Sequence, residues 1–146
     1  MTLGVLTNAD IPALALLEKE CFTDAWGENA WKEEFSRADF FGYSIREEDT
    51  LIGYACGTSL FEESELLRIA VAPDFRKKGY GAVLLEALFQ GAKKRGAEKM
   101  FLEVRENNAP ARGLYEKNGF TQTRVRKRYY ENGENAVEMV KSLNKE

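Results

Sequence analysis

The stretch RKKGYG, residues 76 to 81, places basic side chains and two glycines directly before an apolar helical repeat. A helix N-terminus leaves backbone N–H groups unpaired and carries partial positive charge, so it favours a bound anion. Glycine lets the backbone approach a ligand closely and adopt positive φ angles. The stretch therefore predicts either a loop that binds a pyrophosphate or a solvated basic turn in front of a packed helix.

Two well-known phosphate loops do not fit these residues. A P-loop requires GxxxxGK[ST], whereas Lys77 and Lys78 precede the glycines and no Ser or Thr follows them. A dinucleotide-binding loop requires a third glycine at the position of Leu84. What remains is a basic residue, Arg76, followed by x-x-G-x-G between an expected strand and an expected helix.

The chain contains no histidine, which removes several mechanisms at once. Ser-His-Asp and Cys-His nucleophilic pairs and histidine-ligated zinc are excluded. Cys21 and Cys56 are too few for a four-cysteine metal site, so we expect no metal and two reduced thiols. No neighbouring residue activates Cys56 as a nucleophile. Proton transfer in an enzyme would then use Glu, Asp, Tyr, Lys, Cys, the backbone or water.

Length and charge narrow the class of protein further. With 146 residues and a formal net charge of −3, the chain is expected to form one domain, residues 1–146, without direct nucleic-acid binding. No apolar run approaches the roughly 18 residues that span a bilayer, and no secretory signal is visible. We therefore expect a cytoplasmic protein that does not contact a membrane.

The elements that must position these residues follow from hydrophobic periodicity and helix caps. The sequence predicts the order ααβββαβαββ, a mixed sheet flanked by helices of the α/β (α+β) class. The first helix is expected to be capped by Asn8 or Asp10, and the last by Asn108 and Gly119. Expected helices cover 8–21, 28–35, 79–94 and 108–118; expected strands cover 42–46, 51–60, 65–72, 99–104, 121–130 and 136–142.

Two separated motifs in this order resemble a known family. ELLRIAVAPDFRKKGYGAVLLEAL, followed by FLEVRENNAPARGLYEKNGF, is similar to the GCN5-related N-acetyltransferase (GNAT) superfamily. The second motif and the closing RKRYYENGENAVEM most resemble the ribosomal-protein-alanine N-acetyltransferases (RimI type). The resemblance implies a mostly antiparallel central sheet in which two parallel strands splay apart and hold acetyl-CoA.

The resemblance also implies roles for individual residues. It assigns Glu103 as general base and Tyr115 as general acid. Backbone contacts to the pantetheine are implied for Ile69, Ala70 and Val71, and a further cofactor contact for Asn108. Pyrophosphate contacts are implied for a loop entered at Arg76 and continuing through Lys77, Lys78, Gly79, Tyr80, Gly81 and Ala82.

The residues themselves leave alternatives to the two catalytic roles. By the period of a strand, Glu103 shares a face with Phe101 and Arg105, where it is either a base, a solvated carboxylate or a partner of Arg105. Tyr115 is either an acid that protonates the departing thiolate or an aromatic side chain at the edge of the core.

The expected acceptor side is formed by aromatic residues in two loops. Phe22 and Trp26 belong to the connector CFTDAW, which either contacts the substrate or pins two helices to the core. Tyr129 and Tyr130 either border a peptide groove or form a cross-strand pair. The family often has F-x-x-P-W-S in the connector and a smaller polar residue at the position of Arg68.

The resemblance implies that the chain transfers an acetyl group from acetyl-CoA to a protein N-terminus, and the expected partner is the N-terminal alanine of a small-subunit ribosomal protein. An acceptor that is a small-molecule amine or a lysine side chain is the first alternative. A non-catalytic acyl-CoA-binding module is the second. The sequence does not predict an oligomeric state.

Overall fold

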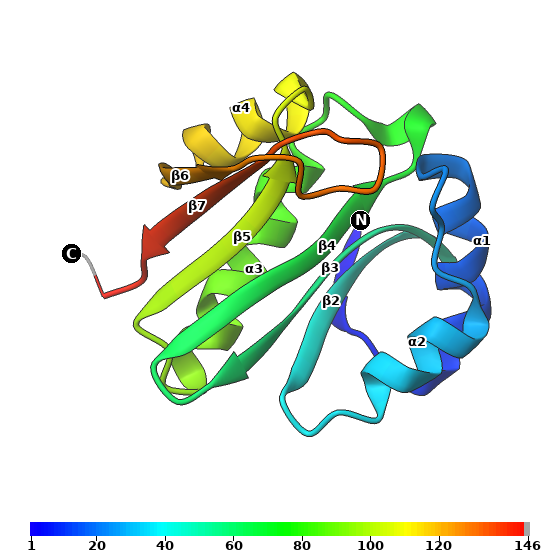
Figure 1. Ribbon diagram of the computed structural model, residues 1–146. Coiled ribbons are helices and arrows are strands. Elements are labelled where there is room, and N and C mark those ends of the chain that lie inside the picture. Colours follow the sequence, from blue (N-terminus) through cyan, green and yellow to red (C-terminus); the bar gives the residue numbers. More distant parts are fainter. Residues whose placement is uncertain (145–146) are drawn as a thin grey trace.

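The computed structural model describes residues 1–144 (Figure 1). A seven-stranded sheet has the order β1-β2-β3-β4-β5-β7-β6, and only the β4–β5 pair is parallel. The strands are β1 Thr2–Val5, β2 Phe40–Glu47, β3 Thr50–Leu60, β4 Glu63–Val71, β5 Lys99–Arg105, β6 Thr121–Arg126 and β7 Ala136–Ser142. The helices are α1 Ile11–Cys21, α2 Glu28–Phe35, α3 Tyr80–Lys94 and α4 Ala109–Lys117, with short 3-10 turns η1 Asn8–Asp10 and η2 Pro73–Phe75.

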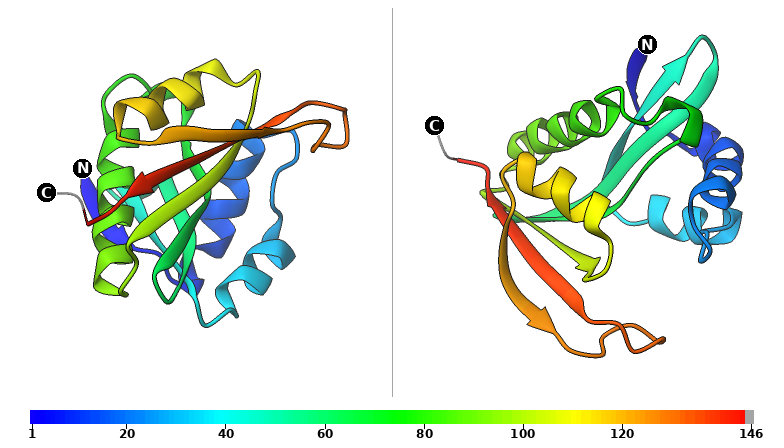
Figure 2. Two further views of the ribbon diagram at one scale, coloured as in Figure 1. Left: turned by 60° about the vertical axis from the view of Figure 1, so that its left-hand side comes forward. Right: turned by 90° about the horizontal axis from the view of Figure 1, so that it is seen from above.

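Helices cover both faces of the sheet (Figure 2). On one face, α3 packs through Leu85 and Leu88 against Met100 and Leu102 of β5, and α4 adds Tyr115 to the same core. On the other face lie α1 and α2, and a second core joins Leu14, Trp31 and Tyr54. The predicted mixed, mostly antiparallel sheet with flanking helices is confirmed.

The predicted element order is correct except at its start and near its end. The strand β1 was not expected, because it has only four residues at the sheet edge and its two apolar side chains, Leu3 and Val5, are exposed. The strand expected over 121–130 ends at Arg126, because Arg128 and Gly133 adopt positive φ angles of 53° and 85° in the following loop. Tyr129 and Tyr130 therefore lie in a loop, and their interpretation as a cross-strand pair is wrong.

The caps agree with the sequence in part. Asp10, one of the two predicted caps, is the N-cap of α1, and its carboxylate accepts the Thr7 backbone N–H at 2.8 Å. Thr7, and not Asn8, is the N-cap of the preceding turn η1. The Asn108 side chain caps α4 as predicted, and Gly119 follows α4 with a φ of +99°. Each cap fixes where a helix begins or ends relative to the neighbouring strand.

The two parallel strands separate soon after they meet. Their pairing runs only from Glu63↔Lys99 to Glu65↔Phe101. On the other side of β4, Leu66 pairs with Gly57 and Arg68 with Cys56, which leaves Leu67 as an unpaired bulge residue. A bulge bends its strand and increases its twist. The bulge directly follows the last β4–β5 pair, so β4 turns away from β5 and the predicted splay is confirmed.

Within residues 1–144, no helix is long and apolar enough to cross a bilayer. In the same range, no group of three or more His, Cys, Asp or Glu side chains is placed to hold a metal ion.

Candidate active site

The loop before α3 presents a row of free backbone donors. The first helical hydrogen bond of α3 runs from the Val83 N–H to the Gly79 carbonyl at 3.2 Å. In the described part of the chain, the six N–H groups from Lys77 to Ala82 donate to no other backbone group. Lys77 and Gly79 have positive φ angles of 64° and 84°, the alternation that turns successive N–H groups toward one anion. The loop can therefore bind a pyrophosphate through its main chain.

The side chains of Leu114 and Arg76 both contact other elements near this loop. A Cβ on Gly81 would lie 3.1 Å from Cδ2 of Leu114, so the start of α3 packs closely against α4. The Arg76 Nε donates to the Val71 carbonyl at 2.9 Å, and its Nη2 lies 3.5 Å from the Cys21 sulfur. Arg76 thus ties the loop to the end of β4 and to the end of α1, and its guanidinium does not face the free N–H groups.

The edge of β4 supplies further open backbone groups. Ala72 donates to the Ile52 carbonyl at 2.7 Å, and Ala70 pairs with Tyr54, so these alternate residues bond β3. Alternation in an antiparallel pair then turns the backbone groups of Ile69 and Val71 away from β3, toward the β4–β5 opening. The Val71 carbonyl already accepts from Arg76, so the open groups are the Val71 N–H and both groups of Ile69. Of the three residues expected to contact pantetheine, Ala70 therefore uses its backbone groups to pair with β3.

The second helix at the opening starts at Asn108. The Asn108 Oδ1 accepts the Ala111 N–H at 3.2 Å, as the N-cap of α4. Helix α4 follows β5 and helix α3 follows β4, so both helix N-termini lie beyond the carboxyl ends of the splayed strands (Figure 1). Their partial positive charges favour an anionic ligand at this opening.

Glu103 lies on β5, two residues beyond the last β4–β5 pair. Its side chain is 20% exposed, and its Oε2 accepts a hydrogen bond from Nη1 of Arg126 at 2.8 Å. Arg105, on the same face, instead pairs with Glu134 at 3.3 Å and lies 4.0 Å from the Tyr130 ring centroid. The alternative in which Glu103 pairs with Arg105 is therefore wrong.

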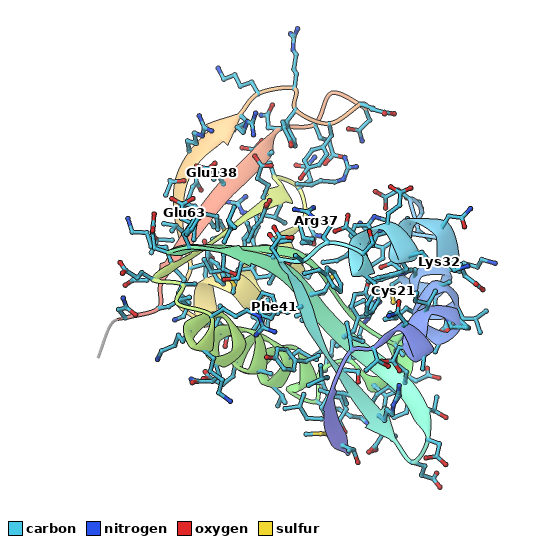
Figure 3. All side chains as sticks on the ribbon, turned by 90° about the horizontal axis from the view of Figure 1, so that it is seen from below. Cys21, Lys32, Arg37, Phe41, Glu63 and Glu138 are labelled. Carbon is cyan, nitrogen blue, oxygen red and sulfur yellow. The ribbon has the colours of Figure 1, made fainter. Side chains whose placement is uncertain are left out.

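A groove of about 710 Å³ runs along the face that carries Glu103. Arg37, Glu63 and Glu138, labelled in Figure 3, come from the turn after α2, from β4 and from β7. Burial and the nearby negative charge of Glu103 raise the pKa of Glu65. The groove is lined by Arg37, Asp39, Thr58, Leu60, Phe61, Glu62, Glu63, Ser64, Glu65, Phe101, Leu102, Glu103, Arg126 and Glu138.

The acidic side chains outnumber the two arginines in this lining, and such a groove suits a cationic acceptor. Glu65 and Arg126 were not predicted as part of the site. Their signal in the sequence was weak, because a charged residue on a strand most often lies on a solvated face.

Tyr115 lies in the core beside the opening. Its side chain is 6% exposed, and burial raises the pKa of its phenol to about 12. Its ring packs edge-on against Phe120 with centroids 5.8 Å apart. The phenol therefore stays protonated near neutral pH and can donate a proton. The burial and packing of Tyr115 also agree with the alternative, in which it is an aromatic side chain of the core.

The loop after β6 brings two more tyrosines close to Glu103. Tyr129 and Tyr130 pack edge-on with centroids 5.1 Å apart, and Arg126 lies 4.4 Å from the Tyr129 ring centroid. A hydrogen bond to Glu103 and its negative charge raise the pKa of the Tyr129 phenol. Burial, followed by the charge of Glu103, raises the pKa of Tyr130. The structure thus brings the predicted tail tyrosines to the predicted base.

Phe22 and Trp26 surround a residue that the sequence left without a role. The guanidinium carbon of Arg68 lies 4.1 Å from the Phe22 ring centroid and 4.9 Å from that of Trp26. Arg68 also binds Glu18, a fully buried carboxylate on α1. Neither aromatic residue lines the groove described above. Glu18 was missed, although its place on the apolar stripe of Leu14, Leu17 and Cys21 was visible in the sequence.

The cysteines offer no nucleophile. Cys56 is fully buried, and burial strongly raises the pKa of its thiol, which therefore stays protonated. Burial also raises the pKa of Cys21, although the nearby Arg76 opposes the shift. The sequence prediction against Cys56 as a nucleophile agrees with this environment.

Comparisons with known proteins match this arrangement. The sequence model described as the acetyltransferase (GNAT) family matches residues 11–120. The [ribosomal protein bS18]-alanine N-acetyltransferase of Salmonella typhimurium is 32% identical over 129 residues, which is 88% of this chain and 86% of that protein.

Two solved structures share the fold. The crystal structure of the ribosomal-protein-S18-alanine N-acetyltransferase from Escherichia coli has a TM-score of 0.90 at 30% identity, over 99% of this chain and 95% of that one. The PaiA N-acetyltransferase from Thermoplasma acidophilum, solved in complex with coenzyme A, has a TM-score of 0.80 at 21% identity and covers 97% and 99% of the two chains. By its sequence along most of its length, this chain belongs to the GNAT family of acetyltransferases.

Proposed function

We propose that this acetyltransferase moves the acetyl group of acetyl-CoA to the N-terminal α-amine of a protein, with the N-terminal alanine of the small-subunit ribosomal protein bS18 as acceptor. One observation of the structure carries the reaction: the groove that contains Glu103 reaches the point where β4 and β5 separate. Similarity to the bS18-alanine N-acetyltransferases supports the acceptor. Because ribosomal proteins are made in the cytoplasm, we place the reaction there.

The donor side of the proposed site is formed by backbone groups. The free N–H groups from Lys77 to Ala82 would hold the pyrophosphate of acetyl-CoA. The backbone groups of Ile69 and the N–H of Val71 would pair with the pantetheine as an added strand does, while the Val71 carbonyl accepts from Arg76. Such pairing runs the thioester along the β4–β5 opening toward Glu103 and Tyr115.

Two proton transfers accompany attack of the amine on the thioester carbon. Glu103 accepts the proton of the acceptor ammonium, directly or through water, which frees the nitrogen lone pair. The new C–N bond forms as the C–S bond breaks, and the thiolate leaves with the bonding electrons. Tyr115 donates its phenolic proton to that thiolate. With its pKa raised to about 12, the Tyr115 phenol carries its proton when the thiolate forms, although the same shift makes the transfer to the thiolate more costly.

The groove favours a peptide over a small amine. Its rim includes Phe61, which is 79% exposed, and the exposed Glu63, so the groove is open to solvent along its side. A small amine would be bound more tightly by a closed acidic pocket. An open groove allows the rest of a protein to lie outside the site while its N-terminus reaches Glu103.

The test measures CoA release with a panel of peptides that differ only at the first residue, together with spermidine and free lysine. We expect turnover with a free N-terminal Ala or Ser. The same peptides carrying a blocked N-terminus serve as the matched control and should show none. Turnover of spermidine or lysine without turnover of any peptide would refute the proposed acceptor, whereas CoA binding without any turnover would support a non-catalytic module.

A further inference from the structure

Glu18 is fully buried, although neither the groove nor the cofactor loop uses it. Its carboxylate accepts hydrogen bonds from the Tyr54 hydroxyl and from the Trp26 backbone N–H, the latter at 2.8 Å. It also accepts from Nε and Nη2 of Arg68 at 3.0 and 2.9 Å. A buried carboxylate is costly unless charged and hydrogen-bonding partners satisfy it, so these partners are held firmly in place.

Arg68 joins this carboxylate to the connector between α1 and α2, residues 22–27. Its Nη2 also donates to the Asp24 backbone carbonyl at 3.1 Å. The rings of Phe22 and Trp26 lie against its guanidinium. Arginine presents its donors as a rigid planar fork and stacks on aromatic faces. One side chain therefore fixes both the backbone of the connector and its two aromatic rings.

Through its contacts with Arg68, the connector lies beside β4, the strand whose edge would hold the acyl donor. The bulge at Leu67 places Arg68 on the face that carries α1 and α2. The next residue, Ile69, faces the β4–β5 opening with its backbone groups. Arg68 thus lies between the connector and the strand edge that would hold the acyl donor.

We propose that Arg68 is a positioning residue for acceptor binding: with Glu18, it holds Phe22, Trp26 and the rest of the connector as a preformed wall of the acceptor site. This inference rests on the proposed peptide acceptor and extends it. A wall that is ordered before binding spares the acceptor the cost of ordering it. Loss of the arginine fork therefore weakens acceptor binding and leaves the cofactor loop unchanged.

The chain contains a matched control for this ion pair. Arg46 on β2 pairs with the buried Asp10 of η1, just before α1 begins, as Arg68 on β4 pairs with Glu18. Both pairs fasten the α1 region to the sheet, and within residues 1–144 the Arg46 side chain pairs with Asp10 and makes no hydrogen bond to the connector. Arg46→Lys therefore reproduces the loss of an arginine fork without releasing Phe22 and Trp26.

The kinetic test compares Arg68→Lys with Arg46→Lys. Lysine keeps a positive charge opposite Glu18 but lacks the fork and the flat stacking surface. In Arg68→Lys we expect the KM for the peptide to rise about tenfold, and the KM for acetyl-CoA to change less than about twofold. Arg46→Lys should change neither value. An unchanged peptide KM, a parallel rise of both KM values, or an equal rise in Arg46→Lys would each overturn the proposal.

A second readout does not depend on turnover. The chain has two tryptophans, Trp26 and the fully buried Trp31. Acrylamide quenching of the tryptophan fluorescence should increase in Arg68→Lys, because Trp26 is released while Trp31 stays shielded, and should be unchanged in Arg46→Lys. Unchanged quenching in Arg68→Lys would contradict the proposal. Absence of peptide turnover by the unmodified protein would instead contradict the proposed function, so the two failures are distinguishable.

Discussion

The proposed donor side of this molecule is formed by backbone groups, whereas the proposed acceptor side is formed by side chains. The proposed donor side consists of main-chain groups: the N–H row from Lys77 to Ala82, both backbone groups of Ile69 and the N–H of Val71. The acceptor side consists of side chains from several elements, with Glu103 on β5, Arg126 on β6 and Glu65 on β4. A backbone site depends on local chain conformation, whereas a side-chain site depends on which strands become neighbours.

This difference predicts which substitutions should affect binding on each side. On the donor side, a side chain matters mainly when it alters the backbone, as at Gly79, because the groups that bind are common to all residues. On the acceptor side, the identity of each side chain matters, since charge and hydrogen bonding are supplied by Glu103 and its neighbours. The predictions below separate the two sides by asking which KM, or which rate, each change affects.

The largest effect is expected from Glu103→Gln. The amide cannot accept the proton of the ammonium, so kcat with the peptide should fall about a thousandfold. The affinity for acetyl-CoA, measured by calorimetry, should be unchanged, because the donor side does not use this side chain. Steady-state CoA release gives the rate.

Glu138→Gln is the control for this change. Glu138 pairs directly opposite Glu103 on β7, lines the same groove and binds Arg124 instead. Its loss should lower kcat less than about threefold, as for a surface carboxylate. An equal loss in both variants would mean that the charge of the groove, and not one base, carries the rate.

A smaller loss is expected from Tyr115→Phe, which removes the proton for the leaving thiolate. We expect kcat to fall about a hundredfold, with both KM values nearly unchanged. Tyr43→Phe is the control, because Tyr43 packs against the α3 helix at Gly91, away from the opening. A kcat for Tyr115→Phe equal to that of the unmodified protein would refute the acid role.

The same tyrosine predicts a pH dependence of stability. Burial raises the phenol pKa from 10.0 to about 12, so the folded chain keeps a proton that the unfolded chain releases. The free energy of unfolding should therefore fall as the pH rises from 10 to about 12, by about 1.4 kcal/mol per pH unit for this group, and level off above that range. Denaturant titrations at several pH values should show a shallower fall in Tyr115→Phe.

The smallest effect compares two glycines of the same conformation. Gly79 on the donor side and Gly133 in the tail loop have φ angles of 84° and 85°, and a Cβ on either would meet no atom within 4 Å. Alanine at either position should cost about 1 kcal/mol of stability through backbone strain alone. Only Gly79→Ala should also raise the KM for acetyl-CoA, about fivefold. An equal rise in Gly133→Ala would mean that the KM reports general stability and not the loop.

Much of the fold was predictable because it depends on local signals. The spacing of Leu84, Leu88 and Ala92 predicted α3, and Asn108 with Gly119 predicted the limits of α4. The strand β1 was not predictable, since an alternation of only two apolar residues, Leu3 and Val5, is too short to indicate a strand that forms by pairing with β2. The loop around Tyr129 was missed for a similar reason: its break depends on positive φ angles at Arg128 and Gly133.

The candidate site likewise contains features that depend on local sequence and features that depend on tertiary contacts. The sequence by itself determined the donor loop and the strand that carries Glu103, because glycine positions, caps and alternation act within a few residues of one another. Only the tertiary structure decided that Arg126 pairs with Glu103, that Arg76 turns toward Val71 and Cys21, and that Arg68 binds Glu18. The Glu103, Cys21 and Glu18 contacts join residues 23 to 55 positions apart, and such pairs meet only after the sheet has set its strand order and the bulge in β4 has set its faces.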